Sequence, residues 1–316
     1  MGEIPYISLI FTMLLNIRAM KAKNVLITGG NGLLGYHLTR VYGDSTWNIL
    51  STDIHDHILS PGTSYSPLNI CDKNAVFTLC NEFKPSLILN AAAFTNVDDC
   101  ETSIDTAFAV NTFGPRYLAE WCSLNPCKLI HFSTDYLFNG EDGPYNETAC
   151  PDPINIYGLS KLGGESQIRR ILNNHLIIRT NVLFGKGPTE KASFVRWVVE
   201  SLRNHKLIHV VDDQYNNPTW SDDLALAVKH LDQLELTGVI HYGGSDYLNR
   251  YEFACLVSDI FDLDKTLIHP ITTDRLALAA PRPLKGGLDI SRVQSLPNIP
   301  LTPLKTILKR IKETGY

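Results

Sequence analysis

"VLITGGNGLLG", residues 25–35, joins a run of apolar residues to three glycines, Gly29, Gly32 and Gly35, each three positions apart. The apolar run predicts a buried strand, and the following "LGYHLTRVY" predicts a helix. Glycines between a strand and a helix let backbone N–H groups approach a pyrophosphate at the positive end of the helix. This stretch therefore predicts a dinucleotide-binding turn.

Five apolar runs alternate with longer helical stretches, which is the pattern of a parallel sheet covered on both faces. The runs are "NVLIT" (24–28), "NILST" (48–52), "SLILN" (86–90), "KLIHFS" (128–133) and "HLIIR" (175–179). We therefore expect an α/β fold with a doubly wound parallel (Rossmann) sheet and a smaller C-terminal substrate-binding lobe.

The domain boundaries follow from where this alternation begins and loosens. We expect residues 1–23 to be an extension outside the fold and residues 24–180 to form the NAD(P)-binding Rossmann domain. Residues 181–316 should be mainly the substrate-binding lobe, with part of 207–245 returning to the Rossmann domain. The strands expected at Leu207–Val211 and Val239–Tyr242 should return to the sheet or flank it.

Composition excludes several classes of partner. The net charge of −5 offers no basic surface for nucleic acid. The seven cysteines are an odd number without metal-ligand spacing, which favours reduced thiols in the cytoplasm and no metal site. The apolar run Ile4–Ile17 is short for a bilayer span and follows Glu3 rather than a positive charge, so we expect neither a membrane span nor a secretory signal; a peripheral anchor is the alternative.

The cofactor is expected to be NADPH or NADH. Asp53 follows the second strand in "STDIH" and can accept hydrogen bonds from the adenosine ribose; because a carboxylate repels a 2′-phosphate, NADH should be tolerated. The alanines of "NAAAFTNVDDCE" (90–101) leave space beside a nicotinamide ribose. Expected cofactor contacts, besides Tyr157 and Lys161, are Gly29, Asn31, Gly32, Leu33, Leu34, Asp53, Asn69, Ile70, Ala91, Ala92 and Ala93.

Tyr157 and Lys161 in "NIYGLSKLGGE" (155–165) lie four residues apart and hence on one face of a helix. An ammonium near a phenol favours the phenolate and lowers the pKa, which would make Tyr157 a usable proton donor. Thr134, at a strand end in "HFSTDYLF" (131–138), could hydrogen-bond a substrate carbonyl beside it. Tyr136 has no lysine at helical spacing, so we expect it to be a packing residue.

With these motifs in place, residues 24 to about 310 resemble the dTDP-4-dehydrorhamnose reductase family of extended short-chain dehydrogenases/reductases. The resemblance also includes "AVNTFGPRYLA", "IIRTNVLFG", "VVDDQYNNPTW" and "APRPLKGGLD". It implies that NAD(P)H delivers hydride to C4 of a 4-keto-6-deoxy nucleotide sugar while Tyr157 protonates the alkoxide. Lys161 would tune Tyr157 and hold the ribose, and Thr134 would orient the carbonyl.

The resemblance also implies positions for the substrate, with a dTDP-linked sugar favoured. Asp135 would contact sugar hydroxyls, Asn111 would support the active-site helix and Arg282 would meet the diphosphate; Thr95, Val97, Gln214 and Thr219 would line or border the pocket. Two positions depart from the family: Asn181-Val182 replaces Ser-Trp, so an aromatic wall is missing, and His37 replaces a glutamate that bridges magnesium in some members.

Three alternatives are weighed against the reductase. A 4,6-dehydratase needs Glu directly after the Thr-Asp pair, where this chain has Tyr136. An epimerase would be served equally well by the Tyr/Lys pair. The regulatory β subunit of methionine adenosyltransferase has the same fold and binds NADP as a partner protein; the complete set of Thr134, Tyr157 and Lys161 counsels against that role. A homodimer is an option that the sequence leaves open.

Overall fold

A computed structural model of the chain describes residues 23–43, 47–57, 63–188 and 193–315. Apart from Lys23, the expected N-terminal extension lies outside the described residues, and so does its apolar run at 4–17. Within the described residues, no helix is both long enough and apolar enough to cross a membrane.

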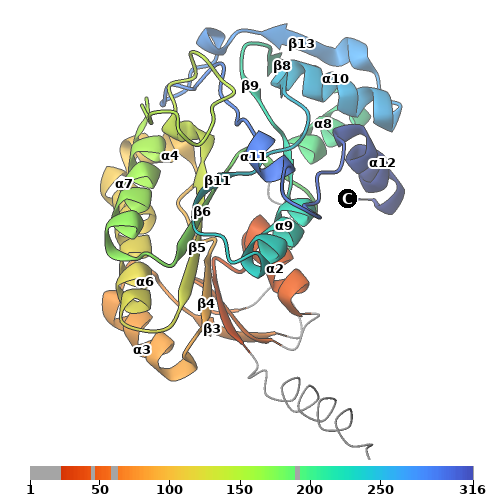
Figure 1. Cartoon of the computed structure of the whole chain (residues 1–316). Coiled ribbons are helices and arrows are strands. Elements are labelled where there is room, and N and C mark those ends of the chain that lie inside the picture. Colours follow the sequence, from red (N-terminus) through yellow and green to blue (C-terminus); the bar gives the residue numbers. More distant parts are fainter. Residues whose placement is uncertain (1–22, 44–46, 58–62, 189–192, 316) are drawn as a thin grey trace, which may run out of the picture.

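A parallel sheet of seven strands forms the centre of the molecule, in the order β11-β6-β5-β4-β1-β2-β3 (Figure 1). The strands are β1 (Asn24–Thr28), β2 (Asn48–Asp53), β3 (Ser64–Pro67), β4 (Leu87–Asn90), β5 (Lys128–Thr134), β6 (His175–Thr180) and β11 (Gly238–His241). All six pairings between neighbours are parallel. This confirms the expected doubly wound α/β fold, and β3 is an edge strand that the apolar pattern did not predict.

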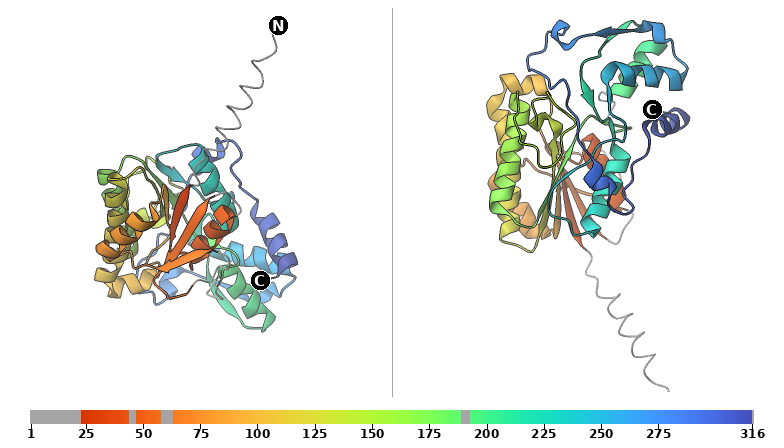
Figure 2. Two further views of the ribbon diagram at one scale, coloured as in Figure 1. Left: turned by 90° about the horizontal axis from the view of Figure 1, so that it is seen from below. Right: turned by 45° about the horizontal axis from the view of Figure 1, so that its top comes forward.

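Helices cover both faces of the sheet, as Figure 1 and Figure 2 show. One layer holds α3 (Lys73–Phe83), α4 (Val97–Thr102), α5 (Ile104–Phe108), the π-helix η1 (Ala109–Phe113), α6 (Gly114–Ser123) and α7 (Ile156–Ile171). The other holds α2 (Leu33–Gly43), α9 (Ser221–Gln233) and α11 (Ser291–Gln294). Successive strand residues alternate between two buried clusters: Leu26 and Ile88 pack under the first layer, and Ile27 and Leu89 under the second.

A second lobe with its own apolar core stands at the carboxyl end of the sheet (Figure 2). It contains α8 (Phe194–Arg203), β8 (Ile208–Val211), α10 (Arg250–Phe261), η3 (Lys265–Leu267), β13 (Ile268–Ile271), η4 (Thr273–Arg275) and α12 (Leu304–Thr314). The strand expected at 207–211 is β8, which pairs with β13 here and does not join the central sheet, whereas the strand expected at 239–242 is β11 and does.

Short strand pairs connect the two lobes. β7 (Leu183–Phe184) pairs with β10 (Thr219–Trp220), and β9 (Tyr215–Asn216) pairs antiparallel with β12 (Leu248–Asn249). These pairs follow β6 or precede α9 and α10, so they place the loops of the second lobe directly above the strand ends. In a parallel α/β sheet that edge is where ligands bind.

Candidate active site

The start of helix α7 is fixed by two side chains, and Tyr157 is its second residue. Asn155 Oδ1 accepts a hydrogen bond from the backbone N of Gly158 at 2.8 Å, which is an N-cap. Glu101 Oε1 accepts one from the backbone N of Ile156 at 2.9 Å. Because both bonds satisfy N–H groups of the first turn, the backbone that carries Tyr157 is held at the end of β5.

Tyr157 contacts both Thr134 and Tyr136, because the fold brings η2 (Asp135–Leu137) against α7. The rings of Tyr136 and Tyr157 meet edge to face with centroids 5.6 Å apart. Burial raises the pKa of Tyr157 well above its ordinary value, while the hydrogen bond with Thr134 lowers it. Tyr136 is thus a packing neighbour of Tyr157, in keeping with the role expected for it.

Lys161 lies one turn further along α7, with its side chain 2% exposed. Its ammonium donates to the backbone O of Phe132 at 2.5 Å and lies 3.4 Å from His131 Nε2. Burial lowers the pKa of Lys161 to about 8, against the raising effect of Glu165. We expected Lys161 to lower the pKa of Tyr157; the net direction at Tyr157 is the opposite, because burial outweighs the other contributions.

Asn111, in the π-helix, ties the active-site helix to the loop after β4. Its Nδ2 donates to the backbone O of Phe94 at 2.9 Å and to Ser160 Oγ at 3.0 Å, and its Oδ1 accepts from the backbone N of Phe94. The expected supporting position of Asn111 is thereby realised in the geometry. A π-helical turn inside a helix is a frequent feature of functional sites.

The glycine turn is packed so closely that larger residues would not fit. Gly29 has φ +68°, and a Cβ there would lie 2.6 Å from the backbone N of Ala92. A Cβ on Gly35 would lie 2.1 Å from the backbone O of Gly29. Helix α2 begins at Leu33, and the first N–H groups of a helix have no intrahelical acceptor, so the turn presents donors of the kind a pyrophosphate needs.

Asp53 stands at the end of β2 next to that turn. Its Oδ2 accepts from the backbone N of Asn31 at 3.1 Å, and its side chain is 13% exposed, so the carboxylate is within reach of a ribose on the same edge. These features fit a dinucleotide cofactor. Asn69 is exposed and caps its own turn through the backbone N of Cys71, whereas Ile70 is buried and fills the space beside Gly114.

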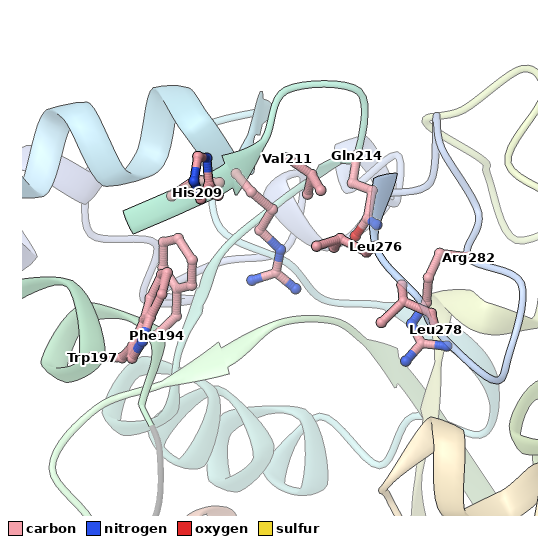
Figure 3. Close-up of a pocket in the computed structure, with 10 residues that line it drawn as sticks. Phe194, Trp197, His209, Val211, Gln214, Leu276, Leu278 and Arg282 are labelled. Atoms are coloured by element: carbon pink, nitrogen blue, oxygen red, sulfur yellow. The ribbon is translucent and has the colours of Figure 1, made fainter. Parts of the chain in front are cut away.

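The second lobe adds a cavity of about 240 Å³ beside the strand ends (Figure 3). Its lining residues are Phe194, Trp197, His209, Val210, Val211, Gln214, Arg250, Leu276, Leu278 and Arg282. Two guanidinium groups and two aromatic rings in one cavity suit a phosphate-bearing ligand with a flat base. Burial raises the pKa of Tyr136, and the charges of Arg250 and Arg282 lower it, so this cavity adjoins the Tyr136 side of the site.

Two expected substrate residues, Gln214 and Arg282, do line this cavity. Gln214 Nε2 donates to Thr273 Oγ1 at 2.9 Å. Arg282 forms an ion pair with Asp98 at 2.7 Å and donates to the backbone O of Ala280, and both contacts orient its guanidinium. Thr95 is exposed and Val97 half-buried, both close in sequence to Asp98.

Thr219, expected at the border of the same pocket, is fully buried beneath it. Its hydroxyl donates to Asn181 Oδ1 at 3.2 Å, and Asn181 Nδ2 donates to Asp135 Oδ2 at 3.1 Å. Asp135 also accepts from the backbone N of Gly287 at 3.2 Å and is 5% exposed. Thr219 therefore acts through Asn181 and Asp135 and has no surface for a ligand, which corrects the expectation of a pocket residue.

Asn181 and Val182 stand where the family that the sequence resembles has Ser-Trp, so the aromatic side chain is missing here. Val182 has φ 41°, a conformation that is unusual for a β-branched side chain. The turn directs the amide of Asn181 inward to Asp135. Where the family has an aromatic side chain beside the substrate, this chain therefore has a buried hydrogen bond between Asn181 and Asp135.

Arg250 is the main cavity-lining residue that the sequence alone did not reveal. It opens helix α10, directly after Asn249, which forms a capping box with Glu252. A cation at a helix N-terminus opposes the helix dipole, and this unfavourable placement was the one available signal for Arg250. Phe194 and Trp197 gave no signal, because aromatic residues on a helix usually belong to a core.

The chain is similar over nearly its whole length to proteins of known family. A family model described as the RmlD substrate binding domain matches residues 23–315. The dTDP-4-dehydrorhamnose reductase of Aggregatibacter actinomycetemcomitans is 31% identical over 301 residues, covering 91% of this chain and 98% of that protein. The methionine adenosyltransferase 2 subunit beta of Mus musculus is 30% identical over 297 residues, covering 91% and 86%.

Solved structures agree with the sequence relatives. The dTDP-4-dehydrorhamnose reductase of Bacillus anthracis, in complex with NADP, superposes with a TM-score of 0.84 at 29% identity, covering 93% of this chain and 100% of that one. The family model covers nearly the whole chain, and the glycine turn and the Thr134/Tyr157/Lys161 set lie within it. The chain therefore belongs to the dTDP-4-dehydrorhamnose reductase family, that of the RmlD substrate binding domain.

Proposed function

We propose that this protein is an oxidoreductase that uses NADPH or NADH to reduce the C4 keto group of a nucleotide-linked 4-keto-6-deoxysugar, with dTDP-4-dehydrorhamnose as substrate and dTDP-L-rhamnose as product. The observation that carries the proposal is the meeting of Thr134, Tyr157 and Lys161 at the carboxyl end of β5, beside a cavity with two arginines. The reductases of the same family bear that activity in their names.

The chain's own residues divide the work of proton transfer. Thr134 donates a hydrogen bond to the carbonyl oxygen, and Tyr157 gives its phenolic proton to that oxygen as the alkoxide forms. Lys161 supplies the positive charge that stabilises the resulting phenolate, which a buried phenol needs because burial raises its pKa. When bound, a reduced nicotinamide supplies the hydride that C4 receives.

The cofactor and substrate would occupy two separate parts of the strand-end edge. Gly29, Gly32 and the start of α2 would hold the pyrophosphate of the cofactor, and Asp53 its adenosine ribose. Asn31, Leu33, Leu34, Asn69, Ile70 and Ala91 to Ala93 would complete that part. Arg250 and Arg282 would bind the diphosphate of the nucleotide sugar, with Phe194 or Trp197 against the base and Thr95, Val97 and Gln214 toward the sugar.

The remaining properties are proposals of the same kind. We propose that the protein acts in the cytoplasm on a soluble nucleotide sugar, without a structural metal. A second copy of the chain is a candidate protein partner. His37, the position of the magnesium-bridging glutamate in some relatives, here contacts the backbone O of Lys186 and lies 3.3 Å from Asp222.

A regulatory role is the second candidate, because several relatives named as methionine adenosyltransferase subunit beta are about as similar as the reductases. One experiment separates it from the reductase. Purified protein is mixed with NADPH or NADH, dTDP-glucose, a 4,6-dehydratase and a 3,5-epimerase, and cofactor oxidation is followed. The reductase consumes cofactor in proportion to product; a regulatory subunit binds the cofactor and leaves it unoxidised, and an epimerase leaves no reduced sugar.

A further inference from the structure

A row of three buried polar side chains crosses the sheet beneath the site and ends at Lys161. Thr28 is in register with Asn90 on the neighbouring strand, and Asn90 with His131 on the next. Thr28 Oγ1 donates to Asn90 Oδ1 at 2.7 Å, and Asn90 Nδ2 lies 2.9 Å from His131 Nδ1. His131 Nε2 then lies 3.4 Å from Lys161 Nζ.

The row is sealed from water, so its hydrogen bonds must be satisfied internally. Thr28 and His131 are both fully buried, and Asn90 is 1% exposed. Burial, and then the charge on Lys161, lower the pKa of His131 well below its usual value, so the imidazole is neutral. A neutral imidazole has one N–H and one lone pair.

The direction of the bonds decides which nitrogen of His131 carries the proton. Because the Thr28 hydroxyl donates to Asn90 Oδ1, the amide NH₂ of Asn90 faces His131 and can only donate. His131 Nδ1 must accept, and the ring proton is on Nε2, pointing at Lys161. An N–H favours an uncharged amine as its neighbour and disfavours an ammonium.

We propose that the row Thr28–Asn90–His131 is a positioning device that fixes the tautomer of His131 and thereby directs the Nε2–H of His131 at the amine of Lys161. His131 is a positioning residue in this scheme, since it acts through Lys161. The inference rests on the proposed role of Lys161 in the reaction. It adds a set of residues, in the core of the sheet, that tunes the site.

Among the residues that the structure describes, few charged and titratable groups surround Lys161. From its own helix, Tyr157 lies one turn before it and Glu165 one turn after; from β5 only His131 approaches it, and Arg179 on β6 binds Glu165 through two hydrogen bonds of 2.9 and 2.8 Å. Glu165 raises the pKa of Lys161, yet its carboxylate is already engaged by Arg179. A substitution in the row that changes no charge can therefore affect the proton on Lys161 through His131.

The substitution Asn90→Asp should reverse the tautomer of His131. A carboxylate accepts from both sides, so His131 must carry its proton on Nδ1 and turn its Nε2 lone pair to Lys161, which favours the ammonium. Thr28→Val, close in shape, removes the hydroxyl that orients the amide and should shift the tautomer in the same direction by less. His175→Gln, at a buried histidine of β6 outside the row, is the matched control.

The direct readout is the long-range ¹H–¹⁵N spectrum of histidine-labelled protein at pH 9 without substrate, with His131 assigned from His131→Gln. We expect the Nε2–H tautomer in wild type and in His175→Gln, and the Nδ1–H tautomer in Asn90→Asp. A wild-type Nδ1–H tautomer, or no change in either row variant, overturns the proposal. This result does not depend on turnover, so it stands apart from the proposed reaction.

The second readout is the pH profile of turnover. In Thr28→Val, which adds no charge, the apparent pKa assigned to Lys161 should rise as the tautomer of His131 shifts, while His175→Gln leaves it unchanged. An unchanged profile in Thr28→Val, with the tautomer of His131 shifted, would contradict the part of the proposal that couples His131 to Lys161.

Discussion

Replacing Lys161 by Met should make the folded protein more stable at neutral pH while abolishing turnover. Burial lowers the pKa of Lys161 from 10.5 to about 8, which corresponds to about 3 kcal/mol at about 1.4 kcal/mol per pKa unit. This amount is lost from the unfolding free energy of the wild-type protein wherever Lys161 is charged in both the folded and the unfolded chain. Methionine removes it but leaves the backbone O of Phe132 without its donor, which costs about 1–3 kcal/mol.

The pH dependence isolates the electrostatic part of this difference. Between pH 8 and 10.5 the unfolded chain holds more protons at Lys161 than the folded one, so the unfolding free energy contributed by this residue rises with pH. The variant lacks the residue, so the difference between variant and wild type should move by about 3 kcal/mol in favour of wild type from pH 7.5 to pH 10.5.

Urea unfolding of both proteins at several pH values measures this shift, and other titrating groups cancel in the comparison. A stability difference that stays constant from pH 7.5 to 10.5 would refute the idea that Lys161 is held with a lowered pKa. Single-turnover oxidation of the cofactor, measured on the same samples, checks that the gain in stability comes with loss of function, as expected for a strained active-site group.

Three further predictions test the site and its supports. Tyr157→Phe should lower kcat by about 10²- to 10⁴-fold, the usual contribution of a general acid, and leave cofactor affinity nearly unchanged. Tyr136→Phe should lower kcat only slightly. Equal losses of kcat in steady-state kinetics would show that the acid is assigned wrongly. Arg250→Leu should raise KM for the nucleotide sugar by about tenfold or more, with a smaller change in kcat, and an unchanged KM would remove Arg250 from the diphosphate site. Gly35→Ala should cost about 1–3 kcal/mol in urea unfolding and weaken cofactor binding in calorimetry, because its Cβ would meet Gly29; Gly43→Ala, which has open space on the same helix, should do neither.

The central sheet could be predicted because strands buried on both faces are continuous apolar runs. Strand β3, "SYSP", escaped this pattern since it lies at the sheet edge, half exposed and ending in proline. The run at 207–211 was recognised as a strand, but its partner β13, "IHPI", contains a proline and gave no strand signal. Which sheet a strand joins depends on its partner, and periodicity within one segment does not encode that.

The meeting of Thr134, Tyr157 and Lys161, the proposed catalytic set, was predictable for a different reason. Tyr157 and Lys161 share one helix, so their spacing alone places them together, and Thr134 is at a strand end that must reach the same edge. Arg250 and Phe194 come from separate helices, and Arg282 from a loop; only the folded second lobe joins them in a cavity. The burial that determines the pKa of Tyr157 is likewise a property of the packing, which is why its direction was not foreseen.

Transfer of deuterium to the sugar tests the proposed reaction most directly. The protein is given dTDP-4-dehydrorhamnose and NADPH deuterated at both reactive positions of the nicotinamide ring, and the product is examined by NMR and mass spectrometry. We expect dTDP-L-rhamnose carrying one deuterium at C4, formed in equal amount to the oxidised cofactor. Cofactor that binds but stays reduced, or a product without deuterium at C4, would contradict it.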